Sequence, residues 1–146
     1  ADTIEDTYTK SRTEALGTEV KKRIMLGTFV LSSSYYDDYY VKAQKVRRKI
    51  DDATKAIFED FDFVISPTTV GVAYKLGHKV ADPMELYLSD IFTVQANLAG
   101  GVPAISLPVF KHSKNNLPCG LQLIANKFEE EKLIAFSKHL FPDGLS

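Results

Sequence analysis

The sequence is poor in cysteine and histidine, the residues that most often cross-link chains or bind metals. It contains one cysteine and three histidines in 146 residues. A single cysteine excludes an internal disulfide framework and fits a reducing compartment. Because Cys119 lies in Leu117-Pro118-Cys119-Gly120-Leu121, just before an apolar run, we interpret it as a strand or turn thiol rather than a nucleophile. The histidines are scattered without metal-ligand spacing, so no metal site is predicted.

A large net charge and long hydrophobic runs are also missing. The formal net charge of -1 provides no general attraction for nucleic acid or an anionic membrane. No apolar stretch approaches the roughly 18 residues of a membrane helix. The first residues, Ala1-Asp2-Thr3-Ile4-Glu5-Asp6, are acidic where a signal peptide is basic and then apolar. We therefore expect a soluble, cytoplasmic chain, in which the basic residues of Lys42–Lys49 form the solvated face of a helix.

The composition, 45% apolar and 25% charged, is that of one globular domain with a core. Hydrophobic periodicity predicts a helix from about Thr13 to Gly27, where the glycine is a plausible stop. A longer helix, capped by Ser34, is predicted over roughly Tyr35 to Asp60 from a single apolar stripe. The first dozen residues are expected to be extended. A last helix, about Glu129 to Leu140, is expected to direct four apolar residues inward: Leu133, Ile134, Phe136 and Leu140.

Three short segments have the character of strands. The β-branched run Phe61–Pro67 is closed by a proline, as a strand ending at a sheet edge would be. Pro103–Val109 and Leu121–Ala125 flank the polar turn His112–Asn116, so they are predicted to form a hairpin.

Between the first strand and the hairpin, Asp82-Pro83 predicts the start of a helix. Met84–Asp90 would be one helical piece and Thr93–Ala99 another, ended by Gly100-Gly101. The predicted fold class is α/β, with a few-stranded mixed sheet packed by helices and left with exposed edges.

Two charged residues are the candidate binding residues. Arg23 lies within Lys21–Thr28 and Asp90 within Tyr87–Phe92, each in an otherwise apolar helical pattern. An unpaired charge there would cost roughly several kcal/mol unless a partner neutralises it. A fixed cation and a fixed anion together suit a free amino acid, which carries a carboxylate and an ammonium. The alternatives are a helix-surface ion pair for Arg23 and a helix cap or turn acceptor for Asp90.

Several blocks of the sequence closely resemble the amidase-signature family, from about Ser11 to the last helix. The blocks are Glu19–Ser32, Tyr35–Asp37, Ala43–Arg47, Asp62–Thr69, Asp82–Gly100, Pro103–Pro108 and Gly120–Gln122. Within that family, the Arg-Ile-Met-Leu-Gly-Thr and Tyr-Leu-Ser-Asp-Ile-Phe-Thr blocks resemble the glutaminase subunits of glutamyl-tRNA(Gln) and aspartyl-tRNA(Asn) amidotransferases. The resemblance implies that residues 1–146 are a single C-terminal portion of an amidase-signature domain.

The resemblance also implies roles for the two charges. Arg23 would hold the α-carboxylate of glutamine and Asp90 its α-ammonium. Ammonia released from glutamine would serve the amidation of misacylated Glu-tRNA(Gln) or Asp-tRNA(Asn), in an ATP-dependent complex with subunits B and C. ATP and Mg²⁺ would be used by the partner subunit, and no cofactor is expected in this chain.

The catalytic residues of the family are not predicted in this chain. The family uses a serine nucleophile, a second serine and a lysine from segments that precede the matched region, and the chain has no Gly-Gly-Ser-Ser-Gly-like run. Ser32-Ser33-Ser34 is interpreted as a helix cap, so the chain alone is expected to be inactive. Two residues, Gly101 and Val102, precede Pro103 where the family pattern has one. Two alternatives to the glutaminase-subunit interpretation of the whole chain are open. One is a free-standing noncatalytic module that binds an amino acid or acts as a scaffold, and the other is a fragment of a general amidase.

Overall fold

The computed structural model describes residues 3–78 and 82–142 of the chain. The chain divides into two compact units, Ala1–Val46 and Arg47–Ser146, and we describe each unit by itself. Across the described ranges, no helix is long and apolar enough to cross a membrane.

The first unit begins with two short helices, although an extended segment was expected. α1 spans Ile4–Lys10, and a π-helix, η1, spans Ser11–Ala15. The Thr3 hydroxyl accepts a hydrogen bond from the backbone N–H of Asp6 at 3.0 Å. Acidic residues in the first turn and Lys10 in the last turn complement the helix dipole. The prediction of an extended start is therefore wrong, because Thr3 and Asp6 cap a helix.

α2 spans Thr18–Val30, so it begins and ends later than the predicted helix. The predicted stop at Gly27 is wrong, because the helix passes through this glycine. Leu31, the C-cap residue, donates its N–H to the Gly27 carbonyl at 3.0 Å. A glycine inside a helix costs only about 1 kcal/mol relative to alanine. The neighbouring helix-forming residues outweigh that cost.

The long helical run predicted from Tyr35 to Asp60 is confirmed. A π-helix, η2, spans Tyr36–Val41 and leads directly into α3, Lys42–Asp60. The predicted cap at Ser34 is wrong, because the N-cap residue is Tyr35 and it makes no side-chain cap hydrogen bond.

Aromatic contacts join the end of α2 to η2. The rings of Phe29 and Tyr35 lie 4.2 Å apart, and those of Tyr35 and Tyr39 lie 6.0 Å apart. Between them, the Ser32 hydroxyl donates to the Phe29 carbonyl at 2.7 Å. The Ser32 hydroxyl therefore acts at the end of α2, while the Ser32 carbonyl accepts from the N–H of Tyr36, the first residue of η2, at 2.9 Å.

The second unit is built on three antiparallel strands. β1 spans Phe63–Pro67, β2 spans Ala104–Lys111 and β3 spans Pro118–Ala125, in the order β1-β3-β2. The predicted β2-β3 hairpin is confirmed, with an irregularity between Leu107 and Phe110 where Pro108 cannot donate a ladder hydrogen bond. The α/β class and the small sheet are confirmed. The pairings differ from the expected mixed sheet in that those described are all antiparallel, because β3 runs opposite to both neighbours.

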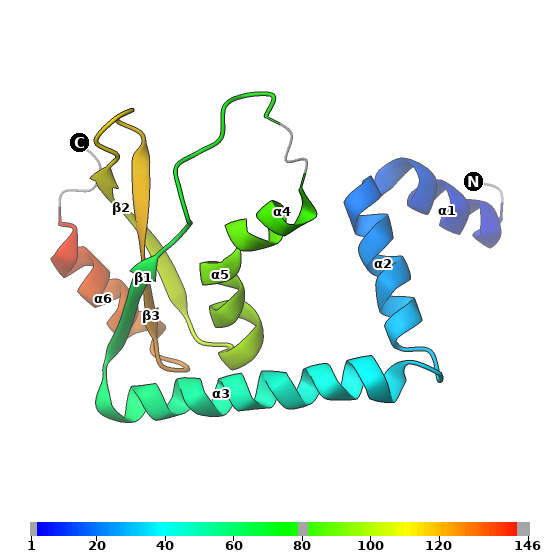
Figure 1. Ribbon diagram of the computed structural model, residues 1–146, viewed down its shortest axis with the longest axis horizontal. Coiled ribbons are helices and arrows are strands. Elements are labelled where there is room, and N and C mark those ends of the chain that lie inside the picture. Colours follow the sequence, from blue (N-terminus) through cyan, green and yellow to red (C-terminus); the bar gives the residue numbers. More distant parts are fainter. Residues whose placement is uncertain (1–2, 79–81, 143–146) are drawn as a thin grey trace. The chain divides into compact units, whose positions relative to one another are not determined.

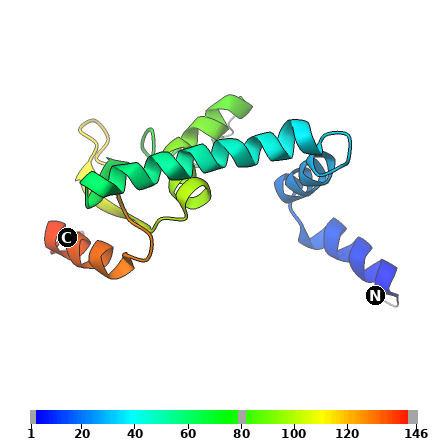
Figure 2. The same ribbon diagram turned by 90° about the horizontal axis from the view of Figure 1, so that it is seen from below.

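The two faces of the sheet carry separate apolar clusters, as alternation along a strand requires. One cluster has the buried residues Leu107, Leu123, Ala125 and Leu133. The other has the buried residues Ala96, Val102 and Ile124, with Phe58 and Val64 packed against them. Figure 1 shows α6 and α5 on opposite sides of the strands, and Figure 2 shows the C-terminal part of α3 on the side away from α6.

The last helix, α6, spans Glu130–Leu140 and packs on the sheet through a narrow stripe. Leu133 is buried, and the ring of Phe136 stacks on Phe63 with centroids 4.3 Å apart. The predicted inward orientation is correct for Leu133 and Phe136. It is wrong for Ile134 and Leu140, which remain exposed because Ile134 lies beside the stripe and Leu140 ends the helix.

Two helical pieces between β1 and β2 are also confirmed. α4 spans Pro83–Ser89, and the Asp82 carboxylate accepts from the Met84 N–H at 2.9 Å. α5, Ile91–Gln95, continues as a π-helix, η3, over Ala96–Gly100. Gly101 ends this run with a φ of 58°, the left-handed conformation typical of a glycine after a helix. The extra residue beside it therefore lies next to the core, since Val102 is buried.

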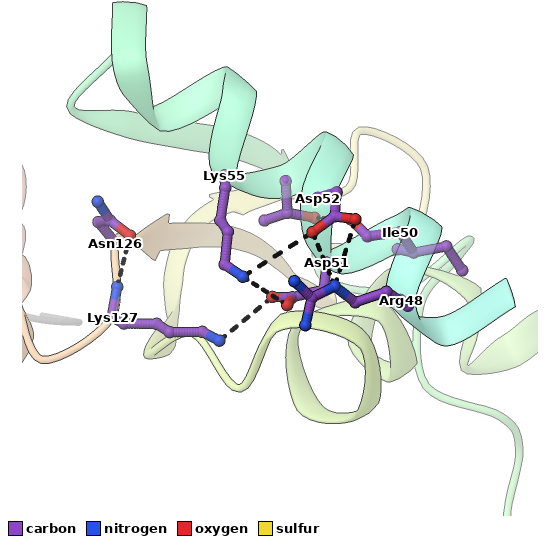
Figure 3. Close-up of polar contacts among 8 residues, drawn as sticks. Arg48, Ile50, Asp51, Asp52, Lys55, Asn126 and Lys127 are labelled. Carbon is purple, nitrogen blue, oxygen red and sulfur yellow. Dashed lines mark hydrogen bonds and ion pairs between the residues drawn. The ribbon is translucent and has the colours of Figure 1, made fainter. Parts of the chain in front are cut away.

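An ion-pair cluster fixes α3 to the segment after β3. The Asp51 carboxylate accepts from Lys55 Nζ at 2.7 Å and from Lys127 Nζ at 3.2 Å. Figure 3 shows these lysines approaching Asp51 from different elements. The hydrogen bonds, first that from Lys55 and then that from Lys127, lower the pKa of Asp51 below its ordinary value.

Candidate functional site

Arg23 lies on an exposed face of α2. Its Nε is 3.1 Å from Glu19 Oε1, one helical turn earlier, and the two side chains are 68% and 57% exposed. This contact is the surface ion pair that was the alternative interpretation of Arg23. A pair so exposed contributes only about 0–1 kcal/mol. Because Glu19 engages Nε, the guanidinium keeps its terminal amino groups for a second anion.

The apolar environment expected around Arg23 does not form within this unit. None of the described residues of α2 is buried, and the neighbours Ile24, Met25 and Leu26 are exposed. The helix has apolar residues, but the described part of the first unit has no element that covers them. The expected desolvation of the Arg23 charge is therefore absent.

Asp90 forms the junction between α4 and α5, where it is exposed to solvent. Its backbone carbonyl accepts from the N–H groups of Thr93 and Val94, each at 3.1 Å, and from the Thr93 hydroxyl at 3.1 Å. Its side chain makes no cap hydrogen bond to α5. The alternative role as a turn acceptor thus belongs to the Asp90 backbone, and the carboxylate remains available for a ligand.

A hollow of about 600 Å³ lies between α4, α5 and the loop after β1, and Asp90 itself is not among its lining residues. Its volume is within the range of about 300–1,000 Å³ for small-molecule sites. Ser89 and Ile91, the neighbours of Asp90 in sequence, both line it. The other lining residues are mainly apolar: Thr69, Val70, Gly71, Val72, Ala73, Tyr74, Glu85, Leu88 and Phe92.

Arg23 belongs to the first unit and Asp90 to the second. The structure therefore places each candidate residue within its own unit. Their use by a single substrate stays a prediction.

A row of polar side chains crosses the sheet on the face of α5. Ser66 and Ser106 stand opposite Gln122 in the register of the two strand pairs. Gln122 is only 4% exposed, and its Nε2 donates to Ser66 Oγ at 3.2 Å and to the Phe92 carbonyl at 2.9 Å. The sequence reasoning missed this row, although a glutamine within the apolar run Leu121–Ala125 is a visible signal of a buried polar contact.

Cys119 lies in β3 and is partly buried, in agreement with the predicted strand thiol. Over residues 3–78 and 82–142, no three His, Cys, Asp or Glu side chains gather in an arrangement that could hold a metal ion.

The amidase family model matches residues 1–134 of the chain. The chain belongs to the amidase family, as its sequence blocks predict. It is 53% identical over 131 residues to the A subunit of the glutamyl-tRNA(Gln) amidotransferase of Sulfurihydrogenibium sp. (strain YO3AOP1), and 52% identical over 133 residues to that of Halothermothrix orenii. These alignments cover 90% and 91% of the chain but only 26% and 27% of the relatives, so the chain spans about a quarter of their length.

Solved structures agree with this assignment. The crystal structure of the glutamyl-tRNA(Gln) amidotransferase A subunit from Thermotoga maritima has a TM-score of 0.68 and 41% identity, over 97% of this chain and 31% of that chain. A second structure, from work on the origins of an s-triazine catabolic enzyme, has a TM-score of 0.70 over 95% of this chain and 31% of that chain. At 24% identity, the second match supports the fold alone.

Proposed function

We propose that this chain is the C-terminal part of the glutaminase subunit of a tRNA-dependent amidotransferase. The observation that carries the proposal is the 53% identity over 131 residues to a protein named as the A subunit of a glutamyl-tRNA(Gln) amidotransferase. The proposal treats residues 1–146 as one C-terminal portion of the amidase-signature domain, with the catalytic portion upstream. In this assignment the protein works in the cytoplasm.

In the proposed reaction, glutamine binds through both of its α-substituents. The terminal amino groups of Arg23 grip the α-carboxylate with two parallel hydrogen bonds, while Glu19 holds Nε and orients the guanidinium. The Asp90 carboxylate, which has no cap bond to satisfy, binds the α-ammonium. Fixing both groups directs the side-chain amide toward the nucleophile.

The chemistry itself belongs to residues outside this chain. A serine oxygen attacks the amide carbon of glutamine, the carbon–nitrogen bond breaks and ammonia leaves, and water then releases glutamate from the acyl-enzyme. The chain alone is therefore inactive.

The proposed assembly includes partner subunits B and C and a misacylated Glu-tRNA(Gln) or Asp-tRNA(Asn). Ammonia passes to the partner subunit, where ATP and Mg²⁺ are used to activate the acyl group of the tRNA. This chain contributes substrate-binding residues and no cofactor.

Two truncated substrates test the roles of Arg23 and Asp90 separately. 4-Aminobutanamide is glutamine without its α-carboxylate, and glutaramate is glutamine without its α-ammonium. In the complete polypeptide that carries this sequence, we expect Arg23→Ala to lower kcat/KM for glutamine by a factor that corresponds to roughly 2–4 kcal/mol of transition-state stabilisation. The value of kcat/KM for 4-aminobutanamide should be unchanged. Asp90→Asn is expected to lower kcat/KM for glutamine and to spare glutaramate.

Lys22→Ala is the matched control, since it removes an exposed cation from the same helix. It should leave the preference for glutamine over 4-aminobutanamide unchanged. An equal loss on both substrates in Arg23→Ala would refute the carboxylate role. An unmodified enzyme that hydrolyses simple amides as well as glutamine would instead support the general-amidase alternative.

A further inference from the structure

The segment that carries Asp90 is fastened to the sheet by one buried amide. Gln122 lies in the central strand, β3, and its Nε2 is 2.9 Å from the carbonyl oxygen of Phe92 in α5. Because a carbonyl oxygen only accepts, the nitrogen end of the amide must face Phe92. The second hydrogen of Nε2 is directed to Ser66 Oγ in β1, at 3.2 Å. One side chain thus connects the central strand β3 and the edge strand β1 to the helix.

This contact is transmitted to Asp90 by a single turn of backbone. Phe92 lies two residues after Asp90 and directly before Thr93. The N–H groups of Thr93 and Val94 both donate to the Asp90 carbonyl. A fixed Phe92 carbonyl therefore fixes the turn from which the Asp90 side chain projects.

Apolar packing alone does not specify this orientation. The η3 residue Ala96 is buried against Val102 and Ile124, and these contacts hold the helical segment against the sheet. Hydrophobic contacts are not directional, so they leave rotation of the helix about its axis weakly determined. A hydrogen bond to one backbone carbonyl selects one rotation.

We propose that Gln122 is a positioning residue, which sets the direction of the Asp90 carboxylate by holding the Phe92 carbonyl on the sheet. The inference rests on the proposed function, because it assigns Asp90 to the α-ammonium of the substrate. It adds to that function a determinant of specificity in β3, on a different element from the binding residue.

The test uses the complete polypeptide with its partner subunits. Gln122→Met keeps the length of the side chain and removes both donors. We expect the ratio of kcat/KM for glutamine to kcat/KM for glutaramate to fall about tenfold, equivalent to about 1.4 kcal/mol. A purely structural role would lower both values together and leave the ratio unchanged. Gln122→Asn is the second variant, for use if Gln122→Met fails to fold. Its shorter side chain retains an amide but withdraws it from Phe92, so the ratio should shift in the same direction.

Ser66→Ala is the matched control, because it removes the other partner of Gln122 and leaves the Phe92 contact in place. In this variant the ratio of kcat/KM for glutamine to kcat/KM for glutaramate should equal that of the unmodified protein. Amide hydrogen exchange at Thr93 and Val94 provides a readout independent of catalysis, and it should accelerate in Gln122→Met but not in Ser66→Ala. Unchanged exchange and an unchanged ratio in the Gln122 variants would overturn the inference. If Asp90→Asn itself leaves the ratio unchanged, the proposed function fails, while the exchange measurement still decides whether Gln122 holds the turn.

Discussion

Gly120 is a position in β3 where a side chain has no room. A Cβ atom there would lie 2.6 Å from Thr68 Oγ1 and 2.8 Å from Ser106 Oγ. These two hydroxyls are hydrogen-bonded to each other at 2.6 Å across the strand. The glycine is therefore required by the close approach of neighbouring side chains, and it lies in β3 two residues before Gln122.

Gly120→Ala is expected to separate Thr68 from Ser106 and to destabilise the fold by about 1–3 kcal/mol, the typical cost of overpacking. Thermal unfolding of the complete polypeptide measures the loss. Gly71→Ala is the control, since no atom lies within 4 Å of the corresponding Cβ. Equal shifts in Tm for the two variants would contradict the steric argument.

Individual residues could be predicted from the sequence only in part. The charges of Arg23 and Asp90 are conspicuous within apolar patterns, yet those patterns do not reveal that both side chains are exposed. Gln122 is equally conspicuous, but its acceptor on Phe92 lies 30 residues away in sequence. Spacing along a chain predicts neighbours within one helix or strand, and it carries no information on contacts that depend on tertiary packing.

Among the elements, α3 contacts the segment after β3 through charged side chains. Asp51 is 14% exposed and joins Lys55, on its own helix, to Lys127 after β3. Asp52, the next residue, pairs with Arg48 on the solvent side, where the side chains are 55% and 71% exposed. Figure 3 shows the two carboxylates and their partners. The two adjacent acids therefore form a matched pair for experiment.

The contribution of Asp51 to stability should depend on pH. Hydrogen bonds from the two lysines hold the pKa of Asp51 below the ordinary value of 3.8. A depressed pKa in the folded state means that the stabilisation is complete above the unfolded value of about 3.9 and is lost as pH falls through the folded value. We expect Asp51→Asn to lower the free energy of unfolding at neutral pH, and the difference from the unmodified protein to shrink below about pH 4.

Denaturant unfolding at several pH values measures this difference. Asp52→Asn should have a smaller effect, because Asp52 and its partners Arg48 and Lys55 are 55%, 71% and 45% exposed. A constant difference for Asp51→Asn between neutral and acid pH would show that the ion pair is not its source.

Elements with local signals were predictable and those with tertiary determinants were not. The β2-β3 hairpin has a polar turn between two apolar runs, and α4 has Asp82 followed by proline. α1 also has a local signal, the cap formed by Thr3 and Asp6. The prediction of an extended start, which is based on the Thr-rich composition, overlooks this cap. By contrast, the central place of β3 in the sheet depends on long-range pairing with β1.

For the whole molecule, the main physical feature is apolar surface without a cover. In the first unit, exposed large apolar side chains occur on both α1 and α2: Ile4, Tyr8, Val20, Ile24, Met25, Leu26 and Phe29. Apolar side chains of this size gain free energy when a partner removes them from water. Such surface favours the proposal in which an upstream catalytic portion covers these helices. It disfavours the alternative of a free-standing module.

The isolated chain is therefore expected to self-associate and to bind an apolar dye. Sedimentation velocity should give a mass above the 16.3 kDa of one chain, and the effect should increase with concentration. Charged substitutions at Ile24 and Phe29 should reduce the association. A compact monomer with little dye binding would instead support the noncatalytic module.

Because β1 pairs with β3, and β3 lies far downstream in the sequence, β1 is synthesised well before its partner. Ser66 in β1 and its partner Gln122 in β3 are 56 residues apart, so a ribosome adding about 5–20 residues per second separates their appearance by roughly 3–11 s. During that interval β1 has left the tunnel without its neighbour in the sheet. A message that ends before β3 yields a nascent chain with an unpaired strand, which makes it a substrate for chaperones and proteases.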